Sequence, residues 1–206
     1  MLIKNLGSQV ESVWEGLRPT TKRLLAGALK TGDPIPHKTH SSNYHYDAHA
    51  DWELSRLLQV LDERTRSRID ATDTSEKANA AELAEMCARI LEEQSGSAEV
   101  FILLASRSIA QSNYDHLEKL ADILLERFSP GEIAEIVRQT ELPQIRAIAF
   151  ETLAMLPVEL VEPLLDDPLY AEVAINSLEQ KAFEFDSEEA RDVLERYDNS
   201  EPLTGN

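Results

Sequence analysis

The chain has one cysteine, Cys87, among its 206 residues. A single cysteine excludes a disulfide framework within the chain and is typical of a reducing compartment. The first residues lack the apolar run of a signal peptide, and no stretch approaches the roughly 18 consecutive apolar residues of a membrane-spanning helix. We therefore expect a cytoplasmic protein with no membrane partner.

Glycine and strand-like patterns are also scarce. The sequence has seven glycines, and few stretches alternate β-branched and polar residues in the way that predicts strands. Apolar residues make up 42% and charged residues 28%, a balance that suits an elongated helical protein with much surface per residue. The composition therefore favours an all-α fold.

Basic residues are few in the C-terminal half. Residues 112–206 carry 22 acidic and 7 basic side chains, a net charge of −15, whereas residues 1–111 have a net charge of −3. Such an acidic half repels phosphate backbones, so we expect no nucleic-acid partner. A basic protein or peptide partner would fit it. An acidic surface that merely keeps the protein dispersed is the alternative, and it is common among soluble proteins.

Motifs of known enzyme classes are missing too. The sequence contains no phosphate-binding glycine loop, G-x-S-x-G elbow, Cys-x-x-Cys or H-E-x-x-H motif. Cys87 shares a helix face with Leu83, Ile90 and Leu91, so we expect it in the core rather than at a catalytic centre. With 38 acidic residues, any pair of carboxylates carries little information. We expect a protein that is not an enzyme.

Helical periodicity, punctuated by proline, glycine and serine, divides the chain into parts. We expect one all-α domain over residues 1–198 and a disordered tail over 199–206. The parts of the domain are an N-terminal helical hairpin (1–32), a long loop (33–50), long helices (51–111) and short helices (112–198). The first long helix is expected from Asp51 to about Ala71.

Two of the short helices align with each other without a gap, at a period of 25 residues. PQIRAIAFETL (143–153) matches PLYAEVAINSL (168–178) in its proline, its apolar positions and its small alanine. The aligned pairs include Ile148/Val173, Ala149/Ala174, Phe150/Ile175, Thr152/Ser177 and Leu153/Leu178. Because neither helix buries its apolar face alone, such units have to stack.

This pattern resembles HEAT-type α-solenoids, and PVELVEPLLDDP (157–168) is similar to the units of leucine-rich-repeat variant proteins. The resemblance covers residues 112–198 at most and is clearest over 142–180. It implies a helical repeat in an α-α superhelix and a protein-binding scaffold. The N-terminal half would then be an irregular helical bundle. A chance alignment of two amphipathic helices in a non-repeating bundle is the alternative.

Four of the five histidines lie in HKTHSSNYHYDAHADWE (37–53). If a helix runs back from Trp52 to His45, then His45, His49 and Glu53 share one face at i,i+4 spacing. Two imidazoles and a carboxylate can bind zinc or another first-row divalent metal, with Asp47 and Asp51 orienting the imidazoles.

Either aspartate is also a good helix N-cap, which would leave His45 in a loop. The alternatives to a metal site are an exposed polar loop and a pH-sensitive contact of the histidines.

The sequence therefore predicts a non-enzymatic interaction or scaffold protein without a cofactor. Its partner would be a protein or peptide, with a basic one fitting the charge, bound on an acidic helical surface. A homo-oligomer is also compatible with the charges. Residues 1–68 carry 10 basic and 8 acidic side chains, so this part of one chain would meet the acidic half of another. The alternative function is a metal-binding protein or metal-dependent hydrolase that uses residues 37–53.

Overall fold

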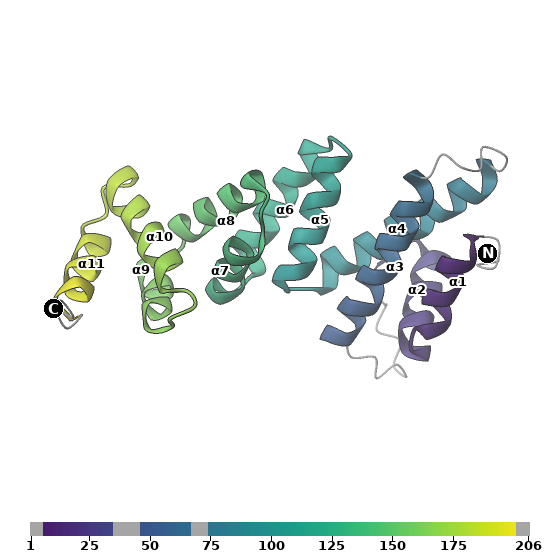
Figure 1. The fold of residues 1–206 in the computed structure, drawn as a ribbon, viewed down its shortest axis with the longest axis horizontal. Coiled ribbons are helices and arrows are strands. Elements are labelled where there is room, and N and C mark those ends of the chain that lie inside the picture. The colour runs from purple at the N-terminus through teal and green to yellow at the C-terminus, as the bar shows by residue number, and fades with distance from the viewer. Residues whose placement is uncertain (1–5, 35–45, 67–73, 201–206) are drawn as a thin grey trace. The chain divides into compact units, whose positions relative to one another are not determined.

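The computed structural model of the chain describes residues 6–34, 46–66 and 74–200. Within these ranges every regular element is a helix (Figure 1), which confirms the all-α fold class. The chain forms two compact units, Met1–Ser95 and Gly96–Asn206. This boundary lies inside the segment 51–111 that the sequence analysis grouped together, and the single domain over 1–198 stays a prediction. Of the expected tail over 199–206, residues 199 and 200 belong to the last helix, and 201–206 lie outside the described residues.

The first unit starts with two short helices. α1 (Ser8–Gly16) follows Gly7, whose φ of 102° is a value that favours glycine. α2 (Pro19–Thr31) has Pro19 at its first position and ends at Gly32 with φ 73°, as the sequence predicts. α1 contacts α3, and α2 contacts both α3 and α4.

Two long helices form most of the core of this unit. α3 (Ala48–Arg66) begins three residues earlier than expected, and its predicted end near Ala71 lies outside the described residues. α4 (Thr74–Gln94) packs along it. The leucines of the α3 stripe are fully buried, as is Cys87 on α4, which confirms its place in the core.

The second unit consists of short helices joined by tight links. In chain order they are α5 (Ala98–Ala110), α6 (Tyr114–Arg127), α7 (Pro130–Gln139), α8 (Pro143–Met155), α9 (Val158–Val161), the 3₁₀ helix η2 (Glu162–Asp166), α10 (Ala171–Glu184) and α11 (Glu188–Ser200). The side chains of Ser97, Asn113, Ser129 and Ser187 accept amide protons at four of the helix starts. Asn113 is the residue that caps α6.

The helices of this unit pack against neighbours that lie close in the sequence. α5 contacts α6, α7 and α8, α6 contacts α8, and α7 contacts α8 and α10. α10 contacts α8, the α9–η2 segment and α11. Figure 1 shows this succession of helices from α5 to α11. No described helix of the chain is long and apolar enough to cross a bilayer.

The two aligned segments have matching burial along α8 and α10. Ala149 and Ala174 are fully buried, as are Leu153 and Leu178. The helix starts differ, because α10 begins at Ala171 and not at Pro168. Pro168 lies in a turn in which the backbone N–H of Leu169 donates to Asp167 Oδ1 at 2.9 Å.

Thr152 and Ser177, a further aligned pair, differ in their hydrogen bonds. Thr152 Oγ1 donates to the carbonyl of Ile148 at 2.8 Å. Ser177 is 1% exposed, and its hydroxyl has no hydrogen-bond partner among the described residues. An unsatisfied buried hydroxyl destabilises the folded state, because it loses its bonds to water without replacement.

We expect Ser177→Ala to raise the free energy of unfolding by up to about 1 kcal/mol, because it removes the unsatisfied hydroxyl. Thr152→Val is the matched variant, since it keeps the side-chain shape and removes a hydroxyl that is bonded. We expect it to lower the free energy of unfolding by about 0.5–1 kcal/mol. Thermal unfolding followed by circular dichroism measures both. A loss of stability in Ser177→Ala equal to that in Thr152→Val would contradict the prediction.

Candidate functional site

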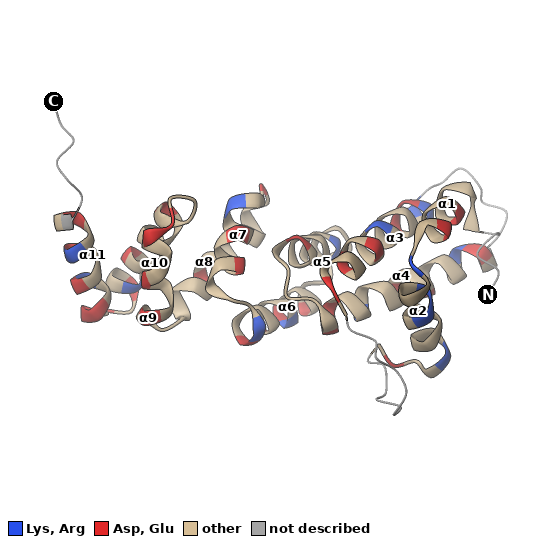
Figure 2. Cartoon of the chain, turned by 90° about the horizontal axis from the view of Figure 1, so that it is seen from below, with Lys and Arg blue, Asp and Glu red and all other residues tan. Residues whose placement is uncertain are grey.

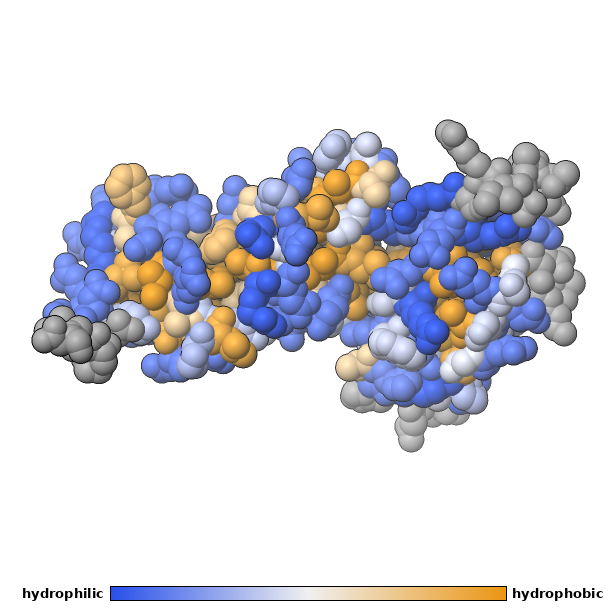
Figure 3. All heavy atoms as spheres, viewed as in Figure 1, coloured by the Kyte–Doolittle hydropathy of each residue, from blue (hydrophilic) through white to orange (hydrophobic). Residues whose placement is uncertain are grey.

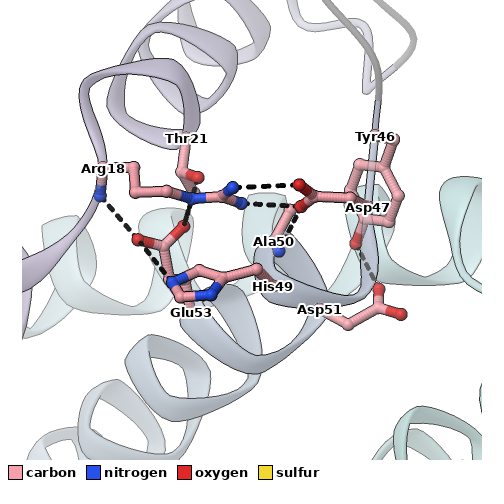
Figure 4. Close-up of polar contacts among 8 residues, drawn as sticks. All are labelled: Arg18, Thr21, Tyr46, Asp47, His49, Ala50, Asp51 and Glu53. Carbon is pink, nitrogen blue, oxygen red and sulfur yellow. Dashed lines mark hydrogen bonds and ion pairs between the residues drawn. The ribbon is translucent and has the colours of Figure 1, made fainter.

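The predicted metal residues lie around the start of α3 (Figure 4). Asp47 caps the helix: its Oδ1 accepts the backbone N–H of Ala50 at 2.9 Å. The helix therefore starts at Ala48 and does not run back to His45, which lies outside the described residues. His49 and Glu53 do come together at i,i+4, with His49 Nε2 3.8 Å from Glu53 Oε1.

Glu53 is turned toward the N-terminus of α2. Its Oε1 accepts the backbone N–H of Arg18 at 2.5 Å, and its Oε2 accepts Arg18 Nε at 3.1 Å. The hydroxyl of Thr21, in the first turn of α2, also donates to Oε2. The carboxylate is 1% exposed, so this buried charge is stabilised by three donors and by the positive end of the α2 dipole.

Arg18 joins Glu53 to the cap of α3. Its two terminal nitrogens donate to the two carboxylate oxygens of Asp47 at 2.9 and 2.6 Å, a bidentate pair (Figure 4). The residue that begins α2 is thereby bonded to the residue that begins α3. We call Arg18, Thr21, Asp47 and Glu53 the Arg18 cluster.

Asp51, the other aspartate considered as a support for the imidazoles, has different partners. It accepts Tyr46 Oη at 2.6 Å and Ser95 Oγ at 2.8 Å. These bonds join the start of α3 to the residue that follows α4. Asp47 and Asp51 therefore form hydrogen bonds at the ends of helices: Asp47 caps α3, and Asp51 joins α3 to the end of α4.

The carboxylates of the Arg18 cluster have lowered pKa values. Burial alone would raise the pKa of Glu53, but the bonds from Thr21 and Arg18, together with the Arg18 charge, lower it below its ordinary value of 4.5. The pKa of Asp47 is lowered mainly by Arg18 and then by the N–H of Ala50. Both groups are held as anions in the folded protein.

We expect the stability that Glu53 contributes to disappear in acid. Because its folded pKa is below its unfolded value, this contribution is complete above about pH 4.5 and is lost as the pH falls through the folded pKa. The difference in melting temperature between the wild type and Glu53→Gln should therefore be largest near neutral pH and should narrow below about pH 4. Melting curves of both proteins over this range measure it. If the difference in melting temperature did not change with pH, Glu53 would not have a lowered pKa in the folded protein.

His49 lies outside the Arg18 cluster on the exposed side of α3. It is 57% exposed and meets Trp52 edge-on, with ring centroids 5.7 Å apart. The guanidinium of Arg56 lies 5.5 Å from the same indole ring. In the ranges that the structure describes, no group of three His, Cys, Asp or Glu side chains is placed to hold a metal ion.

We expect added Zn²⁺ to leave the melting temperature unchanged, because zinc at Glu53 would have to displace Arg18 and Thr21 from the carboxylate. Differential scanning fluorimetry of the protein with added zinc and with added EDTA measures the melting temperature in each case. His49→Ala is the control variant. A zinc-dependent rise of several degrees in the wild type that is lost in His49→Ala would show that a metal binds here after all.

A second region, at α10 and α11, carries exposed apolar side chains that the sequence analysis did not single out. Phe183 is 92% exposed and Phe185 is 56% exposed. Figure 3 shows apolar atoms protruding at the turn between these two helices, at the upper left. Phe183 lies about 140° around the helix from the buried Leu178, a phase difference that the sequence already contains.

A groove of about 680 Å³ lies between these helices. Its lining residues are Asn176, Glu179, Gln180, Ala182, Phe183, Glu184, Arg191 and Leu194. The α10 members at 176, 179, 180, 183 and 184 form one helix face about two turns long. We call this surface the α10–α11 groove.

Asp and Glu positions are frequent along α10 and α11 (Figure 2). Residues 171–200 carry nine carboxylates and three cationic side chains, and each of the cations has a partner within the second unit. Lys181 Nζ donates to the carbonyls of Ala154 and Leu156, Arg191 pairs with Asp186, and Arg196 lies 3.1 Å from Glu162. The surface is therefore strongly negative.

Comparisons of this chain with family models, with curated proteins and with solved structures found no significant match.

Proposed function

We propose that this chain is a non-catalytic interaction protein whose second unit is a HEAT-like helical repeat that binds a protein or peptide partner. The observation that carries the proposal is the surface of α10 and α11, where large apolar side chains are exposed among carboxylates. Exposed aromatic side chains within a patch of one charge sign are typical of binding surfaces.

The repeat is supported by the neighbours and the burial of the helices. α5 contacts α6 and α7 contacts α8, while α5 also contacts α7 and α6 contacts α8, as in stacked helix pairs. The matched burial of α8 and α10 at a period of 25 residues points the same way. In such arrays the outer helix faces stay available to partners.

The charge of the second unit supports a basic partner. With the three cations of α10 and α11 occupied by internal contacts, the carboxylates of these two helices attract a positively charged surface and speed its association. This attraction weakens with salt, because the Debye length falls from about 10 Å at 0.1 M to about 3 Å at 1 M.

Affinity purification from the source organism, read by mass spectrometry, tests the proposal. The bait is the full chain, compared with a variant that reverses exposed charges on α11 (Glu188→Lys, Glu189→Lys and Glu195→Lys). We expect at least one protein to be enriched on the wild type, and to be lost both from the variant and at high salt.

The matched control reverses two exposed or half-exposed charges on α1, Glu11→Lys and Glu15→Lys, which lie in the first unit. We expect this control to retain the partner. Retrieval of no protein above background, or equal loss from both variants, would overturn the proposed function.

A further inference from the structure

We propose that the α10–α11 groove is the docking site itself, and that its occupant is a basic amphipathic helix of the partner, with an apolar side chain placed against Phe183. This inference rests on the proposed function and adds the place and the chemistry of binding. It draws on the shape of the groove, on its charge and on the exposure of Phe183.

The shape of the groove fits a helix. Its α10 wall consists mainly of one helix face about two turns long. The buried Ala174 and Leu178 lie on other faces of α10 than Phe183. α10 and α11 therefore form a groove between two helices. Amphipathic helices bind in such grooves through the apolar side chains on one of their faces.

The anchor is supplied by Phe183 and Leu194. Phe183 is 92% exposed, and Leu194 on α11 is half-buried and lines the same groove. Covering an aromatic ring of this size removes a large apolar area from water, and such aromatic residues dominate the energetics of many interfaces. Phe185 is exposed but does not line the groove.

The charge determines which kind of helix binds. Glu179 and Glu184 lie in the wall of the groove. Glu195 and Asp198 lie four and seven residues after Arg191 along α11, on the same side of that helix. Arg191, the cation that lines the groove, is bonded to the carbonyl of Ala182 and to Asp186. Lysine or arginine residues on the rim of the incoming helix would meet these carboxylates.

The same charges argue against a second copy seated symmetrically on this surface. A two-fold interface brings the same patch of both subunits together. Two copies of α10 and α11, each with nine carboxylates and three cations, would repel each other. The partner therefore brings the positive charge.

Fluorescence anisotropy with a defined probe tests the inference. The probe is a labelled 18-residue amphipathic peptide of lysine, leucine and alanine, with leucine along one face. A peptide of the same composition in scrambled order and a glutamate-for-lysine version are the control peptides. The full chain should bind the probe, with an affinity that falls as salt rises, and should bind both control peptides much more weakly.

Phe183→Ala provides the decisive comparison, with Phe185→Ala as the matched control. We expect Phe183→Ala to raise the Kd of the probe about tenfold, as for the loss of a central aromatic anchor, and Phe185→Ala to change it less than about twofold. Melting curves check that both variants are folded, which the exposure of the two side chains favours. Equal effects of the two variants, or equal binding of the probe and the scrambled peptide, would overturn the inference.

The outcomes separate this inference from the proposed function. If the cellular partner is retained by Phe183→Ala but lost from the α11 charge variant, the groove assignment is wrong and the proposed function stands. If the affinity purification retrieves no partner at all, the proposed function is wrong. If sedimentation shows that the chain alone forms dimers, and Phe183→Ala dissociates them, then the occupant is a second copy and the inference is overturned.

Discussion

Replacing Glu53 by glutamine is expected to lower the free energy of unfolding of the first unit by about 2–4 kcal/mol. The amide keeps the size of the side chain but removes the negative charge, and it turns one acceptor oxygen into a donor. The backbone N–H and the guanidinium of Arg18 and the hydroxyl of Thr21 then compete for one acceptor. A buried donor without an acceptor destabilises the folded state, because its desolvation free energy is no longer offset by a hydrogen bond.

Tryptophan fluorescence measures this effect in the first unit alone. Both tryptophans of the chain, Trp14 and Trp52, lie in residues 1–95, so urea unfolding followed by their emission does not report on the second unit. Glu63→Gln is the matched control on α3, because that carboxylate is exposed and accepts only a long bond from Gln9 at 3.4 Å. A loss below about 1 kcal/mol in Glu53→Gln would show that the Arg18 cluster does not hold the helices together.

Leu178→Ala is expected to destabilise the second unit by about 2–5 kcal/mol, because it removes a fully buried side chain and leaves a cavity. Leu153→Ala, at the aligned position on α8, should cost a similar amount. Both leucines are 0% exposed, and the alignment at a period of 25 residues predicts equivalent positions for them on α8 and α10.

Leu169→Ala is the control for these two variants, since Leu169 is 63% exposed and its truncation should change the stability by less than about 0.5 kcal/mol. Calorimetry of the full chain measures all three, because the second unit contains no tryptophan. If the free energy of unfolding fell strongly for one leucine variant and little for the other, Leu153 and Leu178 would not be at equivalent positions of a repeat. The alignment would then be a coincidence of two amphipathic helices.

Local sequence signals predicted the helices well. Pro19, Pro130 and Pro143 begin helices, and the leucine stripe that starts at Leu54 is buried. These features depend on neighbouring residues and on periodicity, which a single sequence contains. The all-α class follows from them.

The start of α3 and the role of Glu53 were not fixed by local signals. Asp47 and Asp51 are equally good caps, and the bidentate contact with Arg18, 29 residues earlier, accompanies the choice of Asp47. A buried glutamate is rare without a partner, and the partner here is 35 residues away. Sequence spacing placed Glu53 beside His49 correctly, but it did not reveal that Arg18 and Thr21 already bind the carboxylate.

The exposure of Phe183 was hidden for a related reason. An aromatic residue on an amphipathic helix is usually part of a core, and whether it is covered depends on which helix packs next to it. The start of α10 also differs from the expected one, because Pro168 lies in a turn around Asp167 and the helix begins at Ala171. The exposure of Phe183 thus depends on packing between elements, whereas the start of α10 depends on a local turn.

The single buried cysteine gives this protein a built-in reporter. Cys87 is fully buried on α4, and no second thiol competes with it. A thiol reagent can therefore modify the native chain only when the first unit opens, and the labelling rate measures the population of that open form when closing is fast. Labelling with and without a bound partner would then show whether an event in the second unit changes the opening of the first, without any engineered probe.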